Sequence, residues 1–502
     1  MASKHGILLA VGIISDHFGP LVSKVCGCLL RHGALSLQDI VRRLELSPGQ
    51  VKNSLLVLIQ HSCVQAFSTP RGGGNKTATL YLALFNNVLH RLRFSKFLSV
   101  IRADVPESEA LLEGLLQNGR LTFDQLVERT ISKVAEGNLL PAREEIRKNF
   151  NKLVYAHYVE RCPKSEPFFD PLVDEQPTSS RKRASKTVEK VLSLEQKVVC
   201  NAALSDAERF SEIPYFMEGS SNANNNVVAG GKRKHEALEA DEEHSIVAEN
   251  EVLWRANFEK FIFCLKKKFC AERKKAKLKL GTHSIWEAFF EANVTDNHNK
   301  SVTSPIHGIL ERLGQKEGGT SMTLDQVTKV LKDLECISTS ENPEEFTFDL
   351  SKFVETCRND EIESLVKKKY GQEAYIIFRL LIKQGCPVET DEITDATILD
   401  KQIAHGTLYR LWKDEYIDSE RVLSAAGTGN TPFFVWRVKN TVREQFIDHL
   451  YHAALNLRQM VNYIAGLLLE GSKDETKLRI RKNILILALT RHDESLMLFH
   501  DF

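Results

Sequence analysis

The sequence predicts a mainly α-helical chain with short β hairpins, built from a repeated unit and followed by two long C-terminal helices. Three observations lead to this prediction. Apolar residues recur at helical spacing through most of the chain, short β-rich stretches follow groups of helices, and one motif returns at several places. With 502 residues, of which 42% are hydrophobic, the chain has room for about three or four domains with separate cores.

The first repeat unit is predicted within residues 1–100. Gly19-Pro20 separates two helices, and Ser36 and Ser47 each stand where a serine caps the start of a further helix. The segments Cys63–Phe67 and Thr79–Leu82 are typical of two strands joined by a glycine-rich turn. Three helices followed by a hairpin is the element order of a winged helix.

The same order is predicted three more times along the chain. Leu121–Val127 repeats the pattern of Leu35–Val41, and Met322–Val327 echoes the same element again. A fourth copy begins with an apolar helix at Ala374–Ile382 and ends in the β-rich stretch Phe433–Trp436. These copies place winged helices at residues 101–162, 246–355 and 356–440.

Two remaining segments do not follow the repeat. Residues 163–245 are rich in proline at their start and in asparagine near their end, which predicts a linker that is disordered in part. From residue 441 to 502, apolar residues at heptad spacing run from Phe446 to Leu467 and resume after Gly471-Ser472. This pattern predicts an antiparallel coiled coil.

Composition restricts the class of function. Lys and Arg total 67 and Asp and Glu total 66, so a net charge of +1 excludes a uniformly basic nucleic-acid coat. The apolar runs are much shorter than the roughly 18 residues needed to cross a bilayer, and no secretory cleavage site is evident, so we expect a soluble intracellular chain. No metal or cofactor is expected, because the ten cysteines lack Cys-x-x-Cys spacing. Phosphate-binding, dinucleotide and hydrolase motifs are also missing, so no enzymatic activity is expected.

Local basic residues are the candidates for nucleic-acid contact, because a winged helix places its third helix and its hairpin against DNA. In the first unit these residues are Lys52 and Asn53 on the third helix and Arg71 and Lys76 on the hairpin. In the second unit they are Arg143, Arg147 and Lys148. The alternative is that each is an ordinary solvated charge.

The strongest basic run spans Lys266 to Lys279 and contains eight cationic residues and one acidic residue, Glu272. A basic face on a helix anchored by apolar residues suits nucleic acid or an acidic partner, although a solvated helix with no partner is the alternative. Two short clusters in the linker, Arg181–Arg183 and Lys232–Lys234, suit nuclear import. The candidate contacts in the run are Lys266, Lys267, Lys268, Arg273, Lys274 and Lys275.

Several segments resemble the winged-helix subunit of nuclear RNA polymerase III, the largest of the three that form its initiation subcomplex. The resemblance is closest before residue 163, in Leu29–Gly33, Gln50–Leu55 and Leu111–Thr122. It is looser afterwards, in Ile377–Leu381 and Asp493–Ser495. The resemblance implies four extended winged helices and a C-terminal coiled coil.

The same resemblance implies a non-catalytic subunit of DNA-directed RNA polymerase III that acts in the nucleus, in transcription initiation. It would bind promoter DNA, single- or double-stranded and without sequence preference, and help to open it for synthesis of small RNAs such as 5S rRNA and tRNA. The implied partners are the polymerase core, two smaller subunits of the subcomplex and initiation factor IIIB. The alternative is a winged-helix interaction scaffold in another nuclear complex, without DNA binding.

Overall fold

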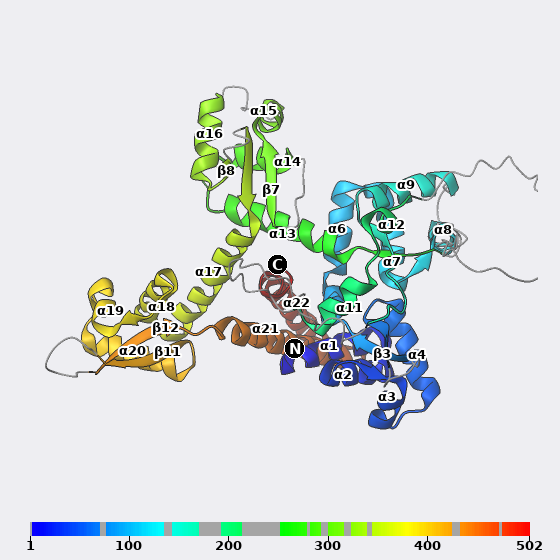
Figure 1. Ribbon diagram of the computed structural model, residues 1–502, viewed down its shortest axis with the longest axis horizontal. Helices are drawn as coiled ribbons and strands as arrows, with labels where there is room; N and C mark the ends of the chain where they lie inside the picture. Colours follow the sequence, from blue (N-terminus) through cyan, green and yellow to red (C-terminus); the bar gives the residue numbers. More distant parts are fainter. Residues whose placement is uncertain are drawn as a thin grey trace, which may run out of the picture. The chain divides into compact units, whose positions relative to one another are not determined.

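The computed structural model divides the chain into two compact units, which are considered separately. One is Ile13–Phe261, and the other joins Met1–Gly12 to Ile262–Phe502. Figure 1 shows the elements with their labels. The structure describes residues 3–70, 77–134, 143–169, 192–212, 252–278, 282–292, 300–315, 323–338, 344–423, 432–470 and 474–502.

Four three-stranded antiparallel sheets of one topology recur in the described residues. In each sheet the strand that comes last in sequence lies between the other two, giving the orders β1-β3-β2, β4-β6-β5, β7-β9-β8 and β10-β12-β11. Each sheet is accompanied by helices in the order helix, strand, helix, helix, strand, strand. The prediction of a mainly helical chain with short β segments is therefore confirmed.

The first repeat forms where its capping residues predict. Ser36 accepts a hydrogen bond from the backbone of Asp39, and Ser47 forms a reciprocal capping box with Gln50. The apolar face of the third helix is buried through Val51 and Leu58. The elements are α1 (Lys4–Phe18), α2 (Pro20–His32), β1 (Leu35–Ser36), α3 (Leu37–Leu44), α4 (Pro48–Gln60), β2 (Val64–Pro70) and β3 (Thr77–Ala83).

The second repeat takes its last strand from a distant part of the chain. Strand β5 (Val159–Arg161) pairs with β6 (Leu253–Ala256), whereas this unit was expected within 101–162 and the next from 246. Hairpin strands are usually joined by about two to five residues, so a short segment that returns after a long insertion carries no local signal. The preceding elements are α5 (Phe85–His90), α6 (Phe94–Asp104), α7 (Glu109–Asn118), β4 (Leu121–Thr122), α8 (Phe123–Val134) and α9 (Arg143–Tyr155).

Parts of the expected linker pack against the first repeat. Helix α11 (Leu194–Ala202) inserts Val198 into a buried cluster with Phe67 and Leu82 of the β2–β3 hairpin. A short helix, α12 (Asp206–Arg209), follows it. The two basic clusters expected to act in nuclear import lie outside the described residues.

In the third repeat, one predicted motif belongs to a different helix from the one expected. We expected Met322–Val327 to match the second helix of a unit, but Thr323 caps α16 (Leu324–Asp333), which is the third. The second is α15 (Ile306–Gly314). A capping box marks where a helix starts, and it does not distinguish the second helix from the third. The other elements are α13 (Phe258–Lys275), α14 (His283–Glu291), β7 (Ser301–Pro305), β8 (Ile337–Ser338), β9 (Glu345–Asp349) and α17 (Leu350–Tyr370).

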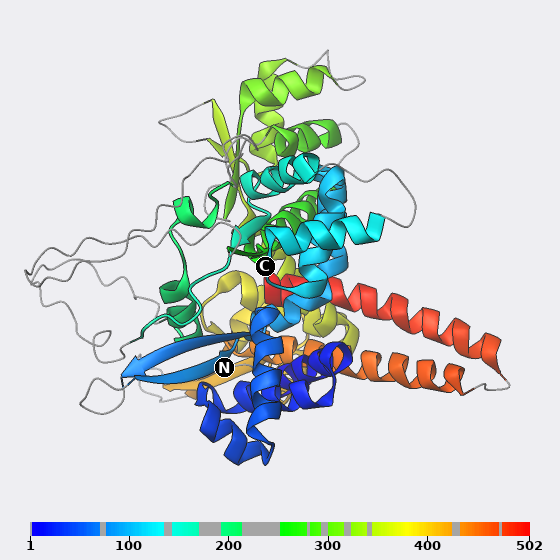
Figure 2. The same ribbon diagram turned by 90° about the vertical axis from the view of Figure 1, so that its right-hand side faces the viewer.

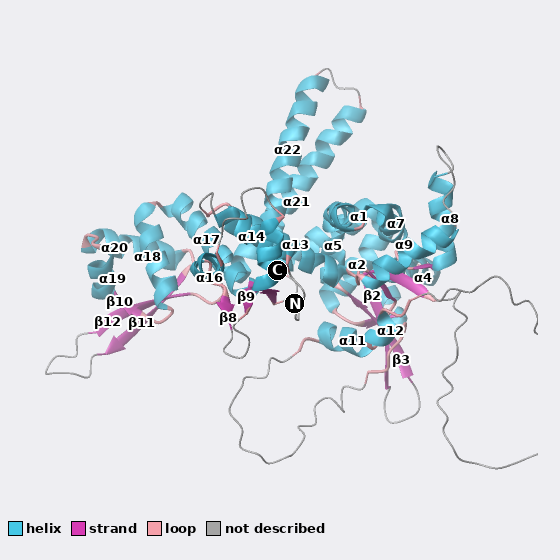
Figure 3. Cartoon of the chain, turned by 90° about the horizontal axis from the view of Figure 1, so that it is seen from above, coloured by secondary structure: helices cyan, strands magenta, loops and turns pink. Residues whose placement is uncertain are grey.

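The fourth repeat precedes two long helices, α21 (Val442–Leu469) and α22 (Glu475–Leu496). These two helices pack side by side as a hairpin, which is seen in Figures 2 and 3. Among the described helices, none has the length and apolar character that a bilayer crossing requires. The elements of the fourth repeat are α18 (Gln372–Gln384), β10 (Val388–Glu389), α19 (Thr390–Thr397), α20 (Lys401–Lys413), β11 (Ile417–Leu423) and β12 (Pro432–Val438).

Candidate nucleic-acid interface

Helix α4 presents the predicted polar contacts of the first repeat to solvent. Lys52 and Asn53 are both exposed, outside the face that buries Val51 and Leu58. The ends of the hairpin pair through Pro70 and Thr77. Arg71 and Lys76 belong to the connection between these ends and lie outside the described residues.

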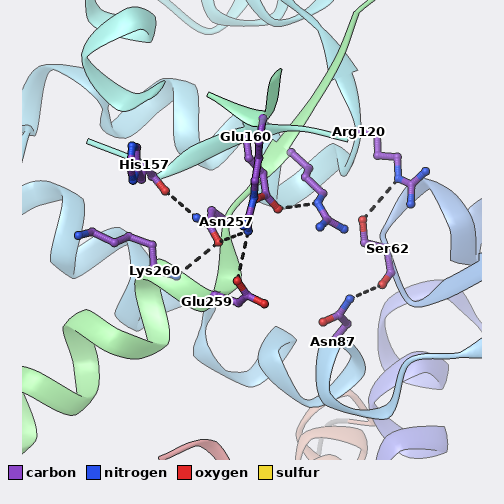
Figure 4. A network of polar contacts seen from close by, with 10 residues as sticks. Ser62, Asn87, Arg120, His157, Glu160, Asn257, Glu259 and Lys260 are labelled. Atoms are coloured by element: carbon purple, nitrogen blue, oxygen red, sulfur yellow. Dashed lines mark hydrogen bonds and ion pairs between the residues drawn. The ribbon is translucent and has the colours of Figure 1, made fainter. Parts of the chain in front are cut away.

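The C-terminal end of α4 is occupied by contacts within its own compact unit. The Gln60 carbonyl accepts the backbone N–H of Arg120 at 2.9 Å, and the Gln60 side chain donates to the Asn118 carbonyl at 3.1 Å. The Arg120 guanidinium also reaches the Ser62 hydroxyl, as Figure 4 shows. Only the N-terminal part of α4 is therefore available as a contact surface.

Helix α9 uses two of its three predicted cations in local contacts. Arg143 pairs with Asp124, and the Arg147 guanidinium lies 5.8 Å from the centre of the Phe123 ring. Lys148 is exposed. The Arg143 pair is largely solvated, and such pairs are weak, so this arginine can exchange its partner for a phosphate at low cost.

The basic run on α13 is mostly compensated by carboxylates of the same compact unit. Arg273 pairs with Glu361 at 2.9 Å and Lys274 with Glu335 at 3.0 Å. Lys275 pairs with Glu287. Their partners lie on α17, after α16 and on α14, so these ion pairs join α13 to its neighbours.

Three lysines of the run differ in exposure. Lys266 is buried, its ammonium lies 3.4 Å from the Ser351 hydroxyl, and burial lowers its pKa. Lys267 is half-buried and Lys268 is exposed. Lys268 is therefore the member of the predicted set on α13 that is turned fully to solvent.

A buried ion-pair network holds the insertion of the second repeat. The Glu160 carboxylate on β5 accepts from Arg255 on β6 at 2.8 Å and from Arg209 on α12. Arg209 also reaches Glu259 at 3.2 Å. Figure 4 shows Glu160 and Glu259 of this network, which belong to separate segments of the chain. Sequence reasoning missed this network, because its members are far apart in the chain.

Two family models match the chain. One is described as RNA polymerase III subunit RPC82 and covers residues 148–346, and the other is the helix-turn-helix domain of that subunit and covers residues 8–69. Relatives named DNA-directed RNA polymerase III subunit RPC3 extend the match. The chain is 22% identical to the Danio rerio protein over 461 residues. The alignment covers 89% of this chain and 82% of the relative. The chain belongs to this family of RNA polymerase III subunits.

Other RPC3 relatives give the same result. The Homo sapiens protein is 22% identical over 424 residues, covering 82% of this chain and 74% of the relative. The Dictyostelium discoideum protein is 30% identical over 183 residues, or 32% of this chain and 27% of the relative. Membership confirms the resemblance, so this RPC3-type chain is a subunit that assembles in the RNA polymerase III complex. The matched helix-turn-helix region contains Lys52 and Asn53.

Proposed function

We propose that this chain is a non-catalytic subunit that acts in initiation by RNA polymerase III, where it binds promoter DNA and helps to open it. In this proposal the four repeats are winged helices, and their third helices are α4, α9, α16 and α20. The observation that carries the proposal is the sheet topology and helix order that all four repeats share. In a winged helix, the third helix is the element that enters a groove of DNA.

The contacts that we propose are electrostatic. Lys52, Asn53 and Lys148 face solvent on α4 and α9, and Arg143 can join them by exchanging its partner. The proposed set also includes Arg71 and Lys76, in the connection between the hairpin strands, and Arg147 on α9. Lysine and arginine neutralise phosphates without reading sequence, so binding should depend steeply on salt and little on base sequence.

The role proposed for α13 is mainly architectural. Lys266, Arg273, Lys274 and Lys275 all have partners within their compact unit, and Lys267 is half-buried beside them. A cation that already holds a carboxylate must give up that pairing before it can bind a phosphate. Lys268 remains a candidate for contact with DNA.

The long C-terminal hairpin is proposed to be an antiparallel coiled coil that docks on other subunits. Its helices leave Tyr463, Ile480, Ile484 and Leu487 exposed. On α22 the last three of these residues follow i, i+4, i+7 spacing and therefore form one apolar stripe. The proposed partners are the polymerase core, two smaller subunits of the initiation subcomplex and initiation factor IIIB, in the nucleus, for synthesis of RNAs such as 5S rRNA and tRNA.

Charge reversal on the third helices tests the DNA-binding part. We expect polymerase that carries Lys52→Glu with Lys148→Glu to retain promoter DNA about tenfold less well, with a salt dependence shallower by about one unit of slope per lysine. Lys24→Glu is the matched control, because Lys24 is an exposed lysine on α2, the first helix of its repeat. Unchanged retention in the double variant would reject the phosphate contacts proposed on α4 and α9.

A protein-interaction scaffold without DNA binding is the second candidate, and the exposed apolar stripe of α22 favours it. This function requires a complex that survives high salt and a chain that does not retain DNA, since apolar contacts are not screened. Measuring both quantities on one preparation separates the two functions.

A further inference from the structure

We propose that α20, the third helix of the fourth repeat, binds an unpaired DNA strand by stacking bases on its exposed aromatic side chains. This inference rests on the proposed function and assigns one part of it to a site outside the predicted set. The site is formed by His405, Tyr409 and Trp412, which are spaced i, i+4 and i+7 and therefore share one face of the helix.

The opposite face of α20 fixes this orientation. Ala404, Thr407, Leu408 and Leu411 are fully buried, so the aromatic face is turned to solvent. Tyr409 is 57% exposed and Trp412 is 45% exposed. Their ring centres lie 5.8 Å apart with a tilt of 38°, so the two rings are not stacked on each other.

A cation accompanies the aromatic side chains at the C-terminal end of the helix. Lys413 is exposed and follows Tyr409 by four residues, so it shares the face of that ring, and α20 itself contains no carboxylate. Arg410 lies on the side of Ile403 and donates to the Thr407 hydroxyl at 3.2 Å. At the other end Lys401 is paired with Asp391 at 2.9 Å. The cation placed to reach a phosphate beside the two exposed rings is therefore Lys413.

The acidic residues that follow α20 are held by other partners. The Asp414 carboxylate accepts from Lys369 at 2.9 Å and from the Tyr370 hydroxyl. Glu415 accepts from the Gln445 amide at 2.9 Å, and the Lys439 ammonium lies 3.3 Å from it. These contacts compensate the two negative charges closest to the site, which leaves its balance positive.

Aromatic faces combined with cations suit unpaired nucleic acid better than duplex DNA or an apolar peptide. Every base has a face that can stack on a tyrosine or tryptophan, but in a duplex that face is covered by its neighbours. A peptide groove would also need aliphatic contacts. Ile403, the large exposed aliphatic residue of α20, lies half a turn from Trp412 at 3.6 residues per turn and cannot share its surface.

Tryptophan fluorescence of the full chain provides a direct test. The sequence has four tryptophans, of which Trp254 and Trp286 are 1% exposed and Trp436 is 9% exposed. A change of emission on binding at the surface therefore reports Trp412. We expect an unpaired oligonucleotide to quench this emission, a duplex of the same sequence to leave it almost unchanged, and Trp412→Phe to remove the response.

Substitution of the neighbouring ring tests the stacking itself. Tyr409→Ala should weaken binding of the oligonucleotide by about tenfold, in line with the usual worth of one stacked base, and Tyr409→Phe should restore it. Tyr155→Ala is the matched control, because Tyr155 is an exposed tyrosine on α9, another third helix. Equal losses for Tyr409→Ala and Tyr155→Ala would overturn the assignment.

The remaining outcomes separate this inference from the proposed function. If the oligonucleotide leaves the emission of Trp412 unchanged while Lys52→Glu with Lys148→Glu still weakens retention of promoter DNA, α20 is not the site and the proposed function stands. If another polymerase subunit changes that emission in the absence of DNA, and DNA does not, the stripe is a protein contact and the inference is wrong. If quenching follows the predicted pattern while the double variant retains DNA normally, the inference holds and the assigned phosphate contacts are wrong.

Discussion

Glu160 is the residue on which the second repeat and its insertion depend most directly. Its side chain is almost fully buried and accepts from both Arg209 and Arg255. A buried carboxylate is tolerated only when cations and hydrogen bonds replace its water, and removing its charge takes that compensation away from both arginines. The structure therefore makes Glu160 far more important than Glu259, the exposed second partner of Arg209.

Replacing this carboxylate should reveal the difference. We expect Glu160→Gln to lower the free energy of unfolding by about 3 kcal/mol, because the amide keeps the shape and loses the charge. Glu259→Gln should change it by less than about 1 kcal/mol, since that pair is solvated. Urea unfolding of the two full-length variants measures both values, and equal effects would show that the network is not stabilising.

At the scale of elements, the junction between the first two repeats depends on one glycine. Gly119 ends α7 with a φ of +78°, and a Cβ atom there would lie 2.2 Å from the Gln60 carbonyl oxygen. Gly33 ends α2 with the same φ, but a Cβ atom there would meet no atom within 4 Å. The two glycines share their backbone strain and differ in packing.

This pair separates backbone strain from steric exclusion. Gly33→Ala should destabilise the fold by about 1 kcal/mol, the cost of a positive φ at a residue with a side chain. Gly119→Ala should cost clearly more, because the chain at Gln60 must also move, and it should expose the end of α4 to hydrogen exchange. Thermal unfolding together with amide exchange at Arg120 measures these effects, and identical melting shifts would contradict the packing argument.

The sequence predicted elements wherever the signal was local. Ser36 and Ser47 determine helix starts from within three residues, so α3 and α4 were predicted correctly. Met322–Val327 was also recognised as a repeated element, but its predicted place in the repeat was wrong, because the order of the helices depends on the sheet that forms around them. Strand β6 was missed since its partner β5 lies before the long insertion.

In the candidate site, too, local features could be predicted from the sequence and long-range pairings could not. Exposure of Lys52 could be inferred from the helical period, because Val51 and Leu58 define the buried face. The pairing of Lys274 with Glu335 could not be inferred, because these residues are 61 positions apart. The aromatic residues of α20 have a visible helical spacing, but the predicted contacts were chiefly basic residues and did not include them.

At the scale of the whole molecule, the net charge of +1 results from nearly equal numbers of cationic and acidic residues, 67 and 66. Many of these residues form ion pairs. The α13 helix shows this most clearly, since a run of cations in the sequence becomes a set of ion pairs to α14, to α17 and to Glu335, which follows α16. A basic run therefore does not by itself identify a nucleic-acid surface. Exposure after folding decides which cations are free to meet phosphates.

This argument predicts opposite effects for two lysines of one helix. Lys274 is mostly buried, pairs with Glu335 and lies 5.5 Å from the centre of the Phe353 ring. Lys274→Ala should therefore lower the free energy of unfolding by about 1 to 2 kcal/mol. It should leave retention of promoter DNA unchanged. Lys268→Ala should leave the free energy of unfolding unchanged, because the side chain of Lys268 is exposed. Any effect of this variant should be on retention of promoter DNA. Unfolding curves and filter retention of both variants measure the two effects. A loss of DNA binding by the folded Lys274→Ala variant would show that the paired cations of α13 also contact DNA.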